Sequence, residues 1–393
     1  MPTRAQISPK IVDWALKRSH SSVPSLAAKL DLSEGKLSAW AAGASYPTFR
    51  QAQALADALS IPFGYLFLSR PPEKELILPD FRRHPDGSSI APTPDVIDAV
   101  NDIQLKQDWY RDYQVEMGAQ GVSFVGSFST NERTEVVASN IREAVGLTEQ
   151  IQSSASDPDA LLRGLIRHAE SIGVLVMRSG TIAGNTHRPL PMREFRGFAL
   201  SDSLAPTIFI NSSDSKTGQL FTLAHELAHV WLGSSGISPS AAIPSPVRRN
   251  DATQIEWFCN QVAADFLLPR ETFHRYWREY AELGAKRAER IARRLRVSYL
   301  ASLIRASELD LIHAREARRL IEEEKQRIES LPARPKSEGG NFYATFFARN
   351  SERFTIALLE ATKEGRVFYQ EAANLLGVKV PTIDKLVDKV LER

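Results

Sequence analysis

The stretch His225-Glu226-Leu227-Ala228-His229 decides how the rest of the chain is interpreted. The two histidines are four residues apart, so on a helix they lie on one face, within reach of a single metal ion. The glutamate between them points about 100° round the helix, beside such an ion instead of toward it. The pattern predicts a zinc-activated water with an adjacent general base, which is the chemistry of a metallopeptidase.

The composition is that of an ordinary globular protein. Of the 393 residues, 43% are hydrophobic and 24% are charged, and the net charge of +2 neither favours nor excludes a nucleic-acid partner. We see no apolar run of a signal peptide and no window of about 18 uninterrupted apolar residues, so we expect no membrane association. The single cysteine, Cys259, excludes an internal disulfide and a cysteine-rich zinc site, and we interpret it as a small core residue. We therefore expect a cytoplasmic protein whose metal ligands are histidines and carboxylates.

A catalytic zinc ion usually has three protein ligands and a water, so a third side chain must come from a second element. The helix predicted from about residue 252 to Pro269 offers two carboxylates, Glu256 and Asp265. We predict Glu256 as the third ligand, with Asn260, four residues on and on the same face, in a supporting or capping role. The small residues Ala263 and Ala264 allow this helix to approach the first one closely.

Two other interpretations of these residues stay open. His225 and His229 can be a pair of buried, hydrogen-bonded core histidines. Glu256 can be the last member of a capping box that begins at Thr253, although Asp251 offers a competing cap that would free it.

The chain from about residue 159 to 273 resembles the ImmA/IrrE family of zinc metallopeptidases. The motifs that carry the resemblance are the helix 223–229 and the later segment 256–269, with a glutamate, an asparagine four residues on, two alanines and an apolar pair closed by proline. The resemblance implies one zinc ion on His225, His229 and Glu256, with Glu226 activating the water. A pair of strands, 195–201 and 205–211, precedes the first motif and is expected to present an edge to an extended peptide. Another strand is predicted at 172–177, and residues 234–250 are predicted to form a loop.

The first 70 residues resemble the Xre/Cro-type helix-turn-helix family. Five short helices are predicted, and the resemblance rests on 26–33, 37–40, Gly43, Pro47, 55–59 and 65–67. It implies that the third helix enters the major groove of DNA, where the residues facing the bases would be Ser33, Glu34, Lys36 and Ser38. A small helical domain that docks another protein is the alternative. A similar pattern of two helices joined at a short turn recurs near 291–298 and 372–386.

Together these features predict a mostly α-helical protein with a small β-sheet. The expected segments are a helix-turn-helix domain at 1–70, a linker at 71–94, a zincin-like peptidase domain at 95–273, a helical segment similar to a helix-turn-helix at 274–330 and a small helical unit at 341–393.

The predicted function is that of a zinc-dependent regulatory endopeptidase that cuts a repressor or a partner protein and binds DNA through its first domain. One alternative is a regulator without proteolysis, an antitoxin that binds its own operator and a toxin partner. Another is a sensor whose peptidase works only when something binds the C-terminal domain. The sequence leaves a homodimer open, because helix-turn-helix proteins commonly pair to read two half-sites.

Overall fold

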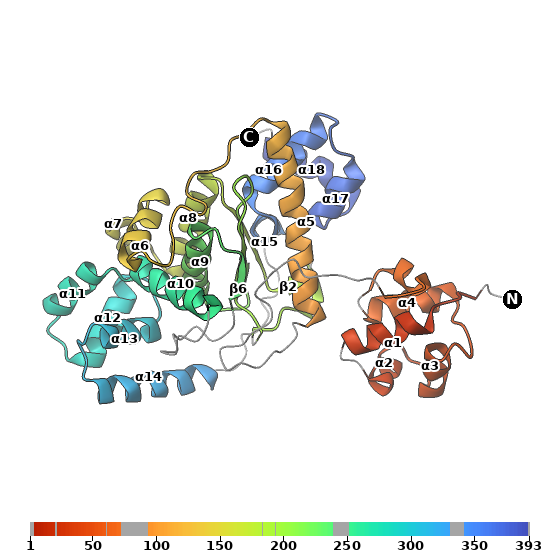
Figure 1. Ribbon diagram of the computed structural model, residues 1–393, viewed down its shortest axis with the longest axis horizontal. Helices are drawn as coiled ribbons and strands as arrows, with labels where there is room; N and C mark the ends of the chain where they lie inside the picture. The colour runs from red at the N-terminus through yellow and green to blue at the C-terminus, as the bar shows by residue number, and fades with distance from the viewer. Residues whose placement is uncertain are drawn as a thin grey trace. The chain divides into compact units, whose positions relative to one another are not determined.

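The chain folds into two compact units, the first within Met1–Ile77 and Ala91–Ile97 and the second within Leu78–Ile90 and Asp98–Arg393. The computed structural model describes residues 4–19, 22–59, 61–71, 93–182, 184–192, 194–238, 251–330 and 342–391. Most of the described residues are helical, as predicted, and a small sheet lies in the second unit (Figure 1). None of the described helices combines the length and apolar character that a membrane crossing requires.

The first unit is a cluster of short helices. They are α1 (Pro9–Arg18), α2 (Val23–Lys29), α3 (Glu34–Ala41), α4 (Phe49–Leu59) and the 3-10 helix η1 (Phe63–Phe67), so the five predicted segments are helical and the last is a 3-10 helix. A serine begins α2, because the Ser22 hydroxyl accepts a hydrogen bond from the N–H of Ser25 at 3.3 Å. The core of the unit gathers apolar side chains from each helix, among them Ile11, Leu26, Trp40, Leu55 and Leu66.

The sheet of the second unit has four strands in the order β1 (Leu175–Ser179), β5 (Thr207–Asn211), β4 (Gly197–Leu200) and β6 (Gly236–Ser238). β1 and β5 are parallel, and β4 is antiparallel to both β5 and β6. β2 (Thr181–Ile182) and β3 (Asn185–Pro189) form a separate two-stranded sheet. The three predicted strands overlap β1, β4 and β5, with the first predicted three residues too early, whereas β2 and β3 were not predicted.

Two predictions about this sheet are wrong. β6 lies inside the segment predicted as a loop at 234–250, whose remainder from residue 239 is outside the described residues. Because β6 pairs with β4, the predicted strand pair at 195–211 does not form the edge of the sheet, and the edge strand is β6. The short, glycine-containing β6 gives no alternation of apolar and polar residues over the four or more residues that identify a strand from sequence.

The remaining elements are helices. In chain order they are α5 (Pro94–Glu116), α6 (Thr134–Ala144), α7 (Glu149–Ser154), α8 (Pro158–Ser171), α9 (Lys216–Trp231), α10 (Asp251–Leu267), α11 (Arg270–Glu279), α12 (Gly284–Arg294), α13 (Tyr299–Glu308), α14 (Ala314–Glu329), α15 (Phe342–Asn350), α16 (Glu352–Lys363), α17 (Tyr369–Leu376) and α18 (Val380–Leu391). The two predicted linkers fall largely on residues 72–92 and 331–341, which lie outside the described residues.

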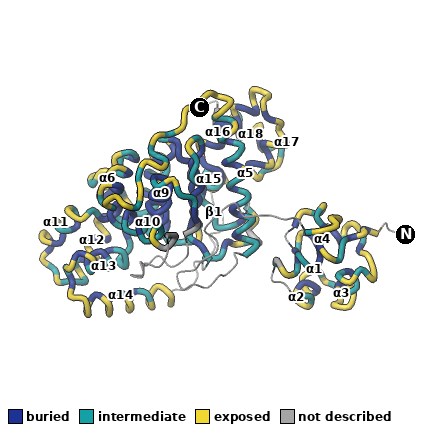
Figure 2. The backbone as a smooth tube through the Cα atoms, viewed as in Figure 1, coloured by how far each residue is buried: buried dark blue, intermediate teal, exposed yellow. Residues whose placement is uncertain are grey.

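The helix α9 is the centre of the second unit. It packs against the sheet on one side and against α10 and α6 on the other, and its residues from Gln219 to Trp231 are almost all buried (Figure 2). Its apolar residues join those of α10 and of the sheet in one continuous core, which includes Leu223, Leu227, Val262 and Ile208. A helix buried on several sides carries no single apolar stripe, and the buried part of α9 accordingly has apolar residues at most of its positions.

The C-terminal helices pack on the same unit. The Arg353 guanidinium donates to the Tyr110 hydroxyl of α5 at 2.8 Å and to the backbone carbonyl of Glu170 in α8 at 3.1 Å. The buried ammonium of Lys106 in α5 lies 2.9 Å from Asp102 and 3.1 Å from the side-chain carbonyl of Asn350. These contacts fix α15 and α16 against α5 and α8.

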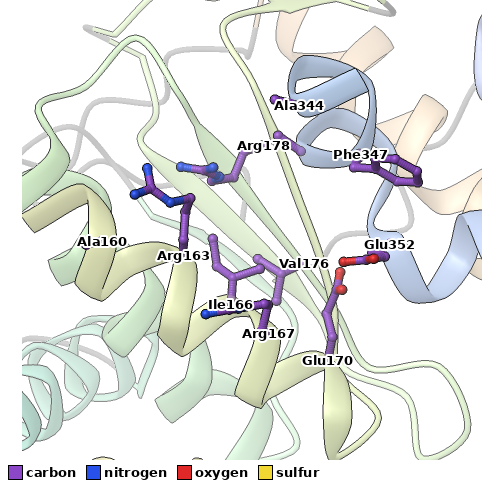
Figure 3. A pocket seen from close by; sticks show the side chains of 11 residues that line it. Ala160, Arg163, Ile166, Arg167, Glu170, Val176, Arg178, Ala344, Phe347 and Glu352 are labelled. Atoms are coloured by element: carbon purple, nitrogen blue, oxygen red, sulfur yellow. The ribbon is translucent and has the colours of Figure 1, made fainter. Parts of the chain in front are cut away.

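We predict that Glu170→Gln removes a pH-dependent loss of stability. Burial raises the pKa of Glu170 to about 7. A hydrogen bond from Ser351 lowers this pKa in part, and the nearby Glu352 carboxylate raises it further (Figure 3). The folded protein therefore binds this proton more tightly than the unfolded chain. Its free energy of unfolding should fall as the pH rises from about 4.5 to 7, by about 3 kcal/mol for this group.

Urea unfolding at about pH 5 and about pH 8 measures this effect. The free energy of unfolding of Glu170→Gln should equal that of the wild type at about pH 5 and exceed it at about pH 8. The exposed Glu132→Gln serves as the control and should follow the wild type at both. An equal decline in Glu170→Gln and wild type would contradict the assignment.

Candidate metal centre

The first two side chains of the centre come from one face of α9. The helix begins at Ser215, whose hydroxyl accepts from the N–H of Gly218 at 3.0 Å, and it runs without interruption past both histidines. His225 and His229 are 4% and 1% exposed, and their Nε2 atoms lie 3.1 Å apart. The spacing of one helical turn therefore brings the two imidazoles together, as the sequence predicts.

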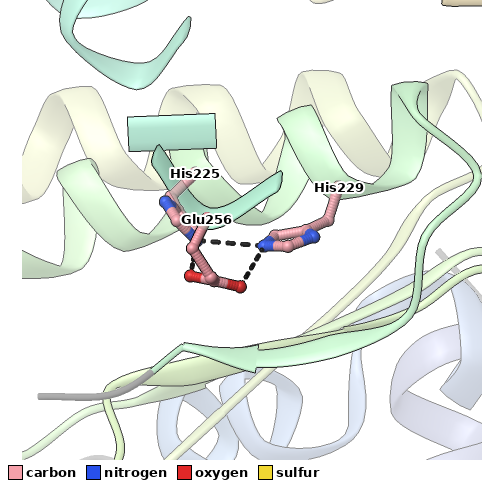
Figure 4. Close-up of side chains that lie close together, drawn as sticks. All are labelled: His225, His229 and Glu256. Carbon is pink, nitrogen blue, oxygen red and sulfur yellow. Dashed lines mark hydrogen bonds and ion pairs between the residues drawn. The ribbon is translucent and has the colours of Figure 1, made fainter. Parts of the chain in front are cut away.

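The third side chain is Glu256 from α10. Its Oε2 lies 3.3 Å from Nε2 of His225, and its Oε1 lies 3.1 Å from Nε2 of His229 (Figure 4). α10 packs closely on α9, with Ala263 and Cys259 fully buried between the helices of this core. Glu256 lies in the second turn of α10 with both oxygens on imidazoles, which excludes the alternative that it caps the helix.

The charges of the three groups depend on one another. Although burial acts in the opposite direction, the imidazoles of His229 and His225 lower the pKa of Glu256, so the carboxyl is ionised. Burial also disfavours a charged His229, but the Cys259 sulfur and the Glu256 carboxylate beside it raise its pKa well above the ordinary value. The ionised carboxylate and the imidazole nitrogens thus give the site a negative electrostatic potential, which attracts a cation.

The arrangement fits a divalent metal ion. The donor atoms of His225, His229 and Glu256 all lie within 4.8 Å of one another. Ligands at about 2.05 Å around a tetrahedral zinc ion are about 3.3 Å apart, which is close to the 3.1 Å between the two Nε2 atoms. The distances of 3.1 and 3.3 Å from these atoms to Glu256 are made by its two different carboxylate oxygens. Two imidazoles and one carboxylate are a donor set that zinc accepts, and they leave one tetrahedral position for another ligand.

Ser234 orients one imidazole. Its hydroxyl lies 3.0 Å from Nδ1 of His229 and 3.4 Å from the backbone carbonyl of the same residue. The hydroxyl can donate to the carbonyl while accepting from Nδ1–H, and this tautomer leaves Nε2 free to bind a metal. Ser234 was not among the site residues predicted from the sequence. The signal for it was Gly233, whose φ of +65° ends α9 and turns the chain back over the last turn of the helix.

Glu226 is fully buried and lies beside the sheet instead of within the cluster. A Cβ atom at Gly197 of β4 would lie 3.0 Å from Oε1 of Glu226, 2.5 Å from Cγ2 of Thr222 and 2.7 Å from the carbonyl oxygen of Phe209. Glycine is therefore required at 197 for β4 to approach α9 at the position of this carboxylate. The catalytic role predicted for Glu226 stays a prediction.

The edge strand β6 passes over the cluster. A Cβ atom at Gly236 would lie 3.5 Å from Cε1 of His229 and 3.8 Å from Oε1 of Glu256. A side chain at position 236 would therefore be in van der Waals contact with two of the three candidate ligands, so β6 lies next to the cluster.

Other residues considered in the sequence lie elsewhere. Asp265 forms a buried ion pair with Arg305 and is no part of the cluster. Asn260 is half-buried one turn after Glu256, and within the described part of the chain its side chain makes no hydrogen bond to the cluster, so its supporting role stays a prediction. Cys259 is buried as predicted, and burial raises the pKa of its thiol. Ser33, Glu34, Lys36 and Ser38 are all exposed on or next to α3 of the first unit.

Comparison with known families supports the interpretation of these three residues as a metal site. Residues 169–307 match the IrrE N-terminal-like domain family, Peptidase_M78, and this range contains all three members of the cluster. Residues 350–389 match a domain of unknown function, DUF8813. No curated protein matches the chain. The predicted resemblance to the ImmA/IrrE peptidases is thus confirmed as an IrrE N-terminal-like domain at 169–307, whereas the comparisons give no support for a helix-turn-helix family at the N-terminus.

Ser234→Ala is expected to weaken zinc binding by about 10- to 100-fold, because the hydrogen bond that orients a ligating histidine contributes to metal affinity. Competition with a fluorescent zinc chelator measures the change. Ser171→Ala, which removes a hydroxyl that donates to the His168 carbonyl at 2.7 Å, is the control and should bind zinc as the wild type does. Equal affinities of Ser234→Ala and wild type would show that Ser234 does not orient the site.

Proposed function

We propose that the chain is a zinc-dependent endopeptidase. The observation that carries this proposal is the convergence of His225 and His229 from α9 and Glu256 from α10 on one position, inside a region that matches a peptidase family. A structural zinc site would need a fourth protein ligand, whereas three ligands with an open position are typical of catalytic sites.

Hydrolysis requires two roles of the chain, binding of a metal ion and general-base catalysis. His225, His229 and Glu256 would hold a divalent ion, which would supply Lewis-acid chemistry at the scissile carbonyl and lower the pKa of a bound water. Glu226 follows His225 directly and serves as the general base, taking the proton from the attacking water at its carboxylate. It then delivers that proton to the departing amine, so that the carboxylate is regenerated after each cycle. The burial of Glu226 excludes competing solvent and keeps this proton transfer local.

We propose that the substrate is a protein segment in extended conformation that pairs with β6. β6 is the last strand of the sheet in the described part of the chain, and its Gly236 lies against His229 and Glu256. A substrate strand added to this edge would gain backbone hydrogen bonds and would pass over the metal position. Such recognition depends little on side chains, so the choice of substrate would come from docking elsewhere on the chain.

The substrate is proposed to be a repressor or another regulatory partner, with the first unit binding DNA. The support for DNA contact is the surface of α3, where Leu37 and Trp40 are buried and the other face, with Lys36 and Ser38, is exposed. A helix presented in this way by a preceding helix is able to enter a major groove.

Glu226→Gln should abolish hydrolysis and leave zinc binding intact, because the amide keeps the shape of the side chain but cannot accept the proton. The expected loss is about 100- to 10,000-fold in the rate of cleavage of a quenched fluorescent peptide library by zinc-loaded protein. Metal content is measured on the same samples, and Glu279→Gln in α11 is the control. Zinc-loaded wild type without peptidase activity would favour the non-proteolytic antitoxin, and unchanged activity in Glu226→Gln would exclude Glu226 as the base.

Lys36→Ala should weaken binding to a DNA fragment from the chain's own promoter by about tenfold if α3 enters the groove. Electrophoretic mobility shift measures the affinity, and Lys10→Ala in α1 is the matched control. Retention of promoter binding by a chain that lacks residues 1–70 would overturn the assignment of DNA contact to the first unit.

A further inference from the structure

A second cavity lies at the opposite end of the sheet from the metal centre. β1 and β6 are the two outer strands of the four, and the cavity lies between β1, α8 and the α15–α16 pair. Its volume is about 390 Å³, which is within the range of small-molecule sites. None of the residues that line it belongs to the proposed peptidase machinery.

Two of the three arginines of this cavity and its two glutamates lie on opposite sides. Arg163 and Arg178 point into one side, and the carboxyl groups of Glu170 and Glu352 face each other on the other side (Figure 3). Arg167 also lines the cavity, and residues 163, 167 and 170 share one face of α8. Seven residues of helix separate Arg163 from Glu170, which corresponds to about 10 Å along the axis.

The arginine side carries uncompensated positive charge. The single carboxylate of Asp159 faces two cations, because it pairs with Arg163 and also lies 2.9 Å from the ammonium of Lys216. Arg178 donates instead to a neutral acceptor, Oε1 of Gln219, at 3.1 Å, and among the described residues it has no carboxylate within ion-pair distance. Burial lowers the pKa of Arg178, so an anion placed beside it would be stabilised more than at an exposed arginine.

The orientation of Gln219 is fixed by its own hydrogen bonds. Its amide nitrogen donates to the backbone carbonyls of Ser212 at 3.1 Å and Asp214 at 2.9 Å, so only the amide oxygen faces the guanidinium. Arg178 is therefore held in place by this contact while the rest of its donors remain available to a ligand.

The opposite side offers acceptors. Glu170 is 7% exposed, and its Oε1 is buried with no hydrogen-bond partner among the described residues. Buried carboxyl oxygens normally have a partner, so this atom indicates a missing donor. The exposed carboxylate of Glu352 adds a second acceptor at the same end.

Between the two ends the wall is apolar. It is formed by Ile166 of α8, Val176 of β1 and Phe347 of α15, with three alanines that keep the space open: Ala160, Ala344 and Ala348. Arg167 of α8 is the one polar side chain that the lining places between the two ends.

We propose that this cavity binds a small dipolar molecule, with an anionic group on the arginine side, an apolar middle of a few methylene groups and an amine at the Glu170–Glu352 side. The chemical class is that of ω-amino carboxylates and similarly charged small molecules. The site goes beyond the peptidase function and does not depend on it. Because it joins α8 and β1 to α15 and α16, a bound ligand would hold these two C-terminal helices, the second of which lies in the region matched as DUF8813, against α8 and β1.

Isothermal titration calorimetry of the full chain with ε-aminocaproate, caproate and hexylamine tests the proposal. The three probes share one chain length and differ only in their charged ends. ε-Aminocaproate should bind with a dissociation constant of about 1 mM, as is reasonable for so few atoms, and the other two should bind at least about fivefold more weakly. Binding of all three probes with equal affinity, or no saturation by ε-aminocaproate at roughly twentyfold higher concentration, would overturn it.

Variants locate the site. Arg178→Gln and Glu352→Gln should each weaken ε-aminocaproate about tenfold, and the control Arg133→Gln, at an arginine whose side chain is 78% exposed, should leave its affinity unchanged. Ala348→Leu fills the cavity without altering charge and should abolish binding even if Arg178→Gln does not fold. Binding that survives Ala348→Leu would place the ligand elsewhere and would contradict the proposal.

Discussion

The packing of α10 against α9 is the contact on which the rest of the second unit depends. Across it the carboxylate of Glu256 meets the two imidazoles of His225 and His229, more than 25 residues earlier in the chain. The approach requires small side chains where the helices are closest, and Ala224, Ala228 and Ala263 are fully buried in this core. A larger residue at these positions would separate the donor atoms, because a close-packed interior transmits a change of volume directly.

The same contact has an electrostatic cost. Two imidazoles are removed from water and the Glu256 carboxylate, whose side chain is 26% exposed, is partly removed, and such groups are unfavourable there unless they are well paired. Their mutual contacts offset part of this cost, and a divalent cation with the same three ligands would offset it more fully. Two residues of the segment after α9 lie at this arrangement, since Ser234 orients His229 and Gly236 of β6 lies next to the same ring. The stability of the fold and the geometry of the candidate metal centre are thus coupled through a few residues.

Much of this was predictable from the sequence. The spacing of His225 and His229 follows from helical geometry alone, and the carboxylate at Glu256 followed from the one helix that offers a suitable ligand, strengthened by the family resemblance. The strands β1, β4 and β5 and the mostly helical class also followed from local patterns. The contacts that depend on tertiary packing did not. Nothing in the local sequence shows that β6 closes the sheet edge, that Ser234 reaches back to His229, or that Arg353 joins the C-terminal helices to α5 and α8. These segments are brought together by packing of the whole core, and the periodicity of apolar residues along the sequence does not show which segments will be in contact.

Diffraction from crystals of the purified chain, recorded on both sides of the zinc absorption edge, tests the central claim most directly. The account predicts one anomalous peak per chain, about 2.0–2.2 Å from Nε2 of His225, Nε2 of His229 and a carboxylate oxygen of Glu256. A zinc-supplemented protein with no peak at this position, or with the peak bound by other side chains, would contradict it.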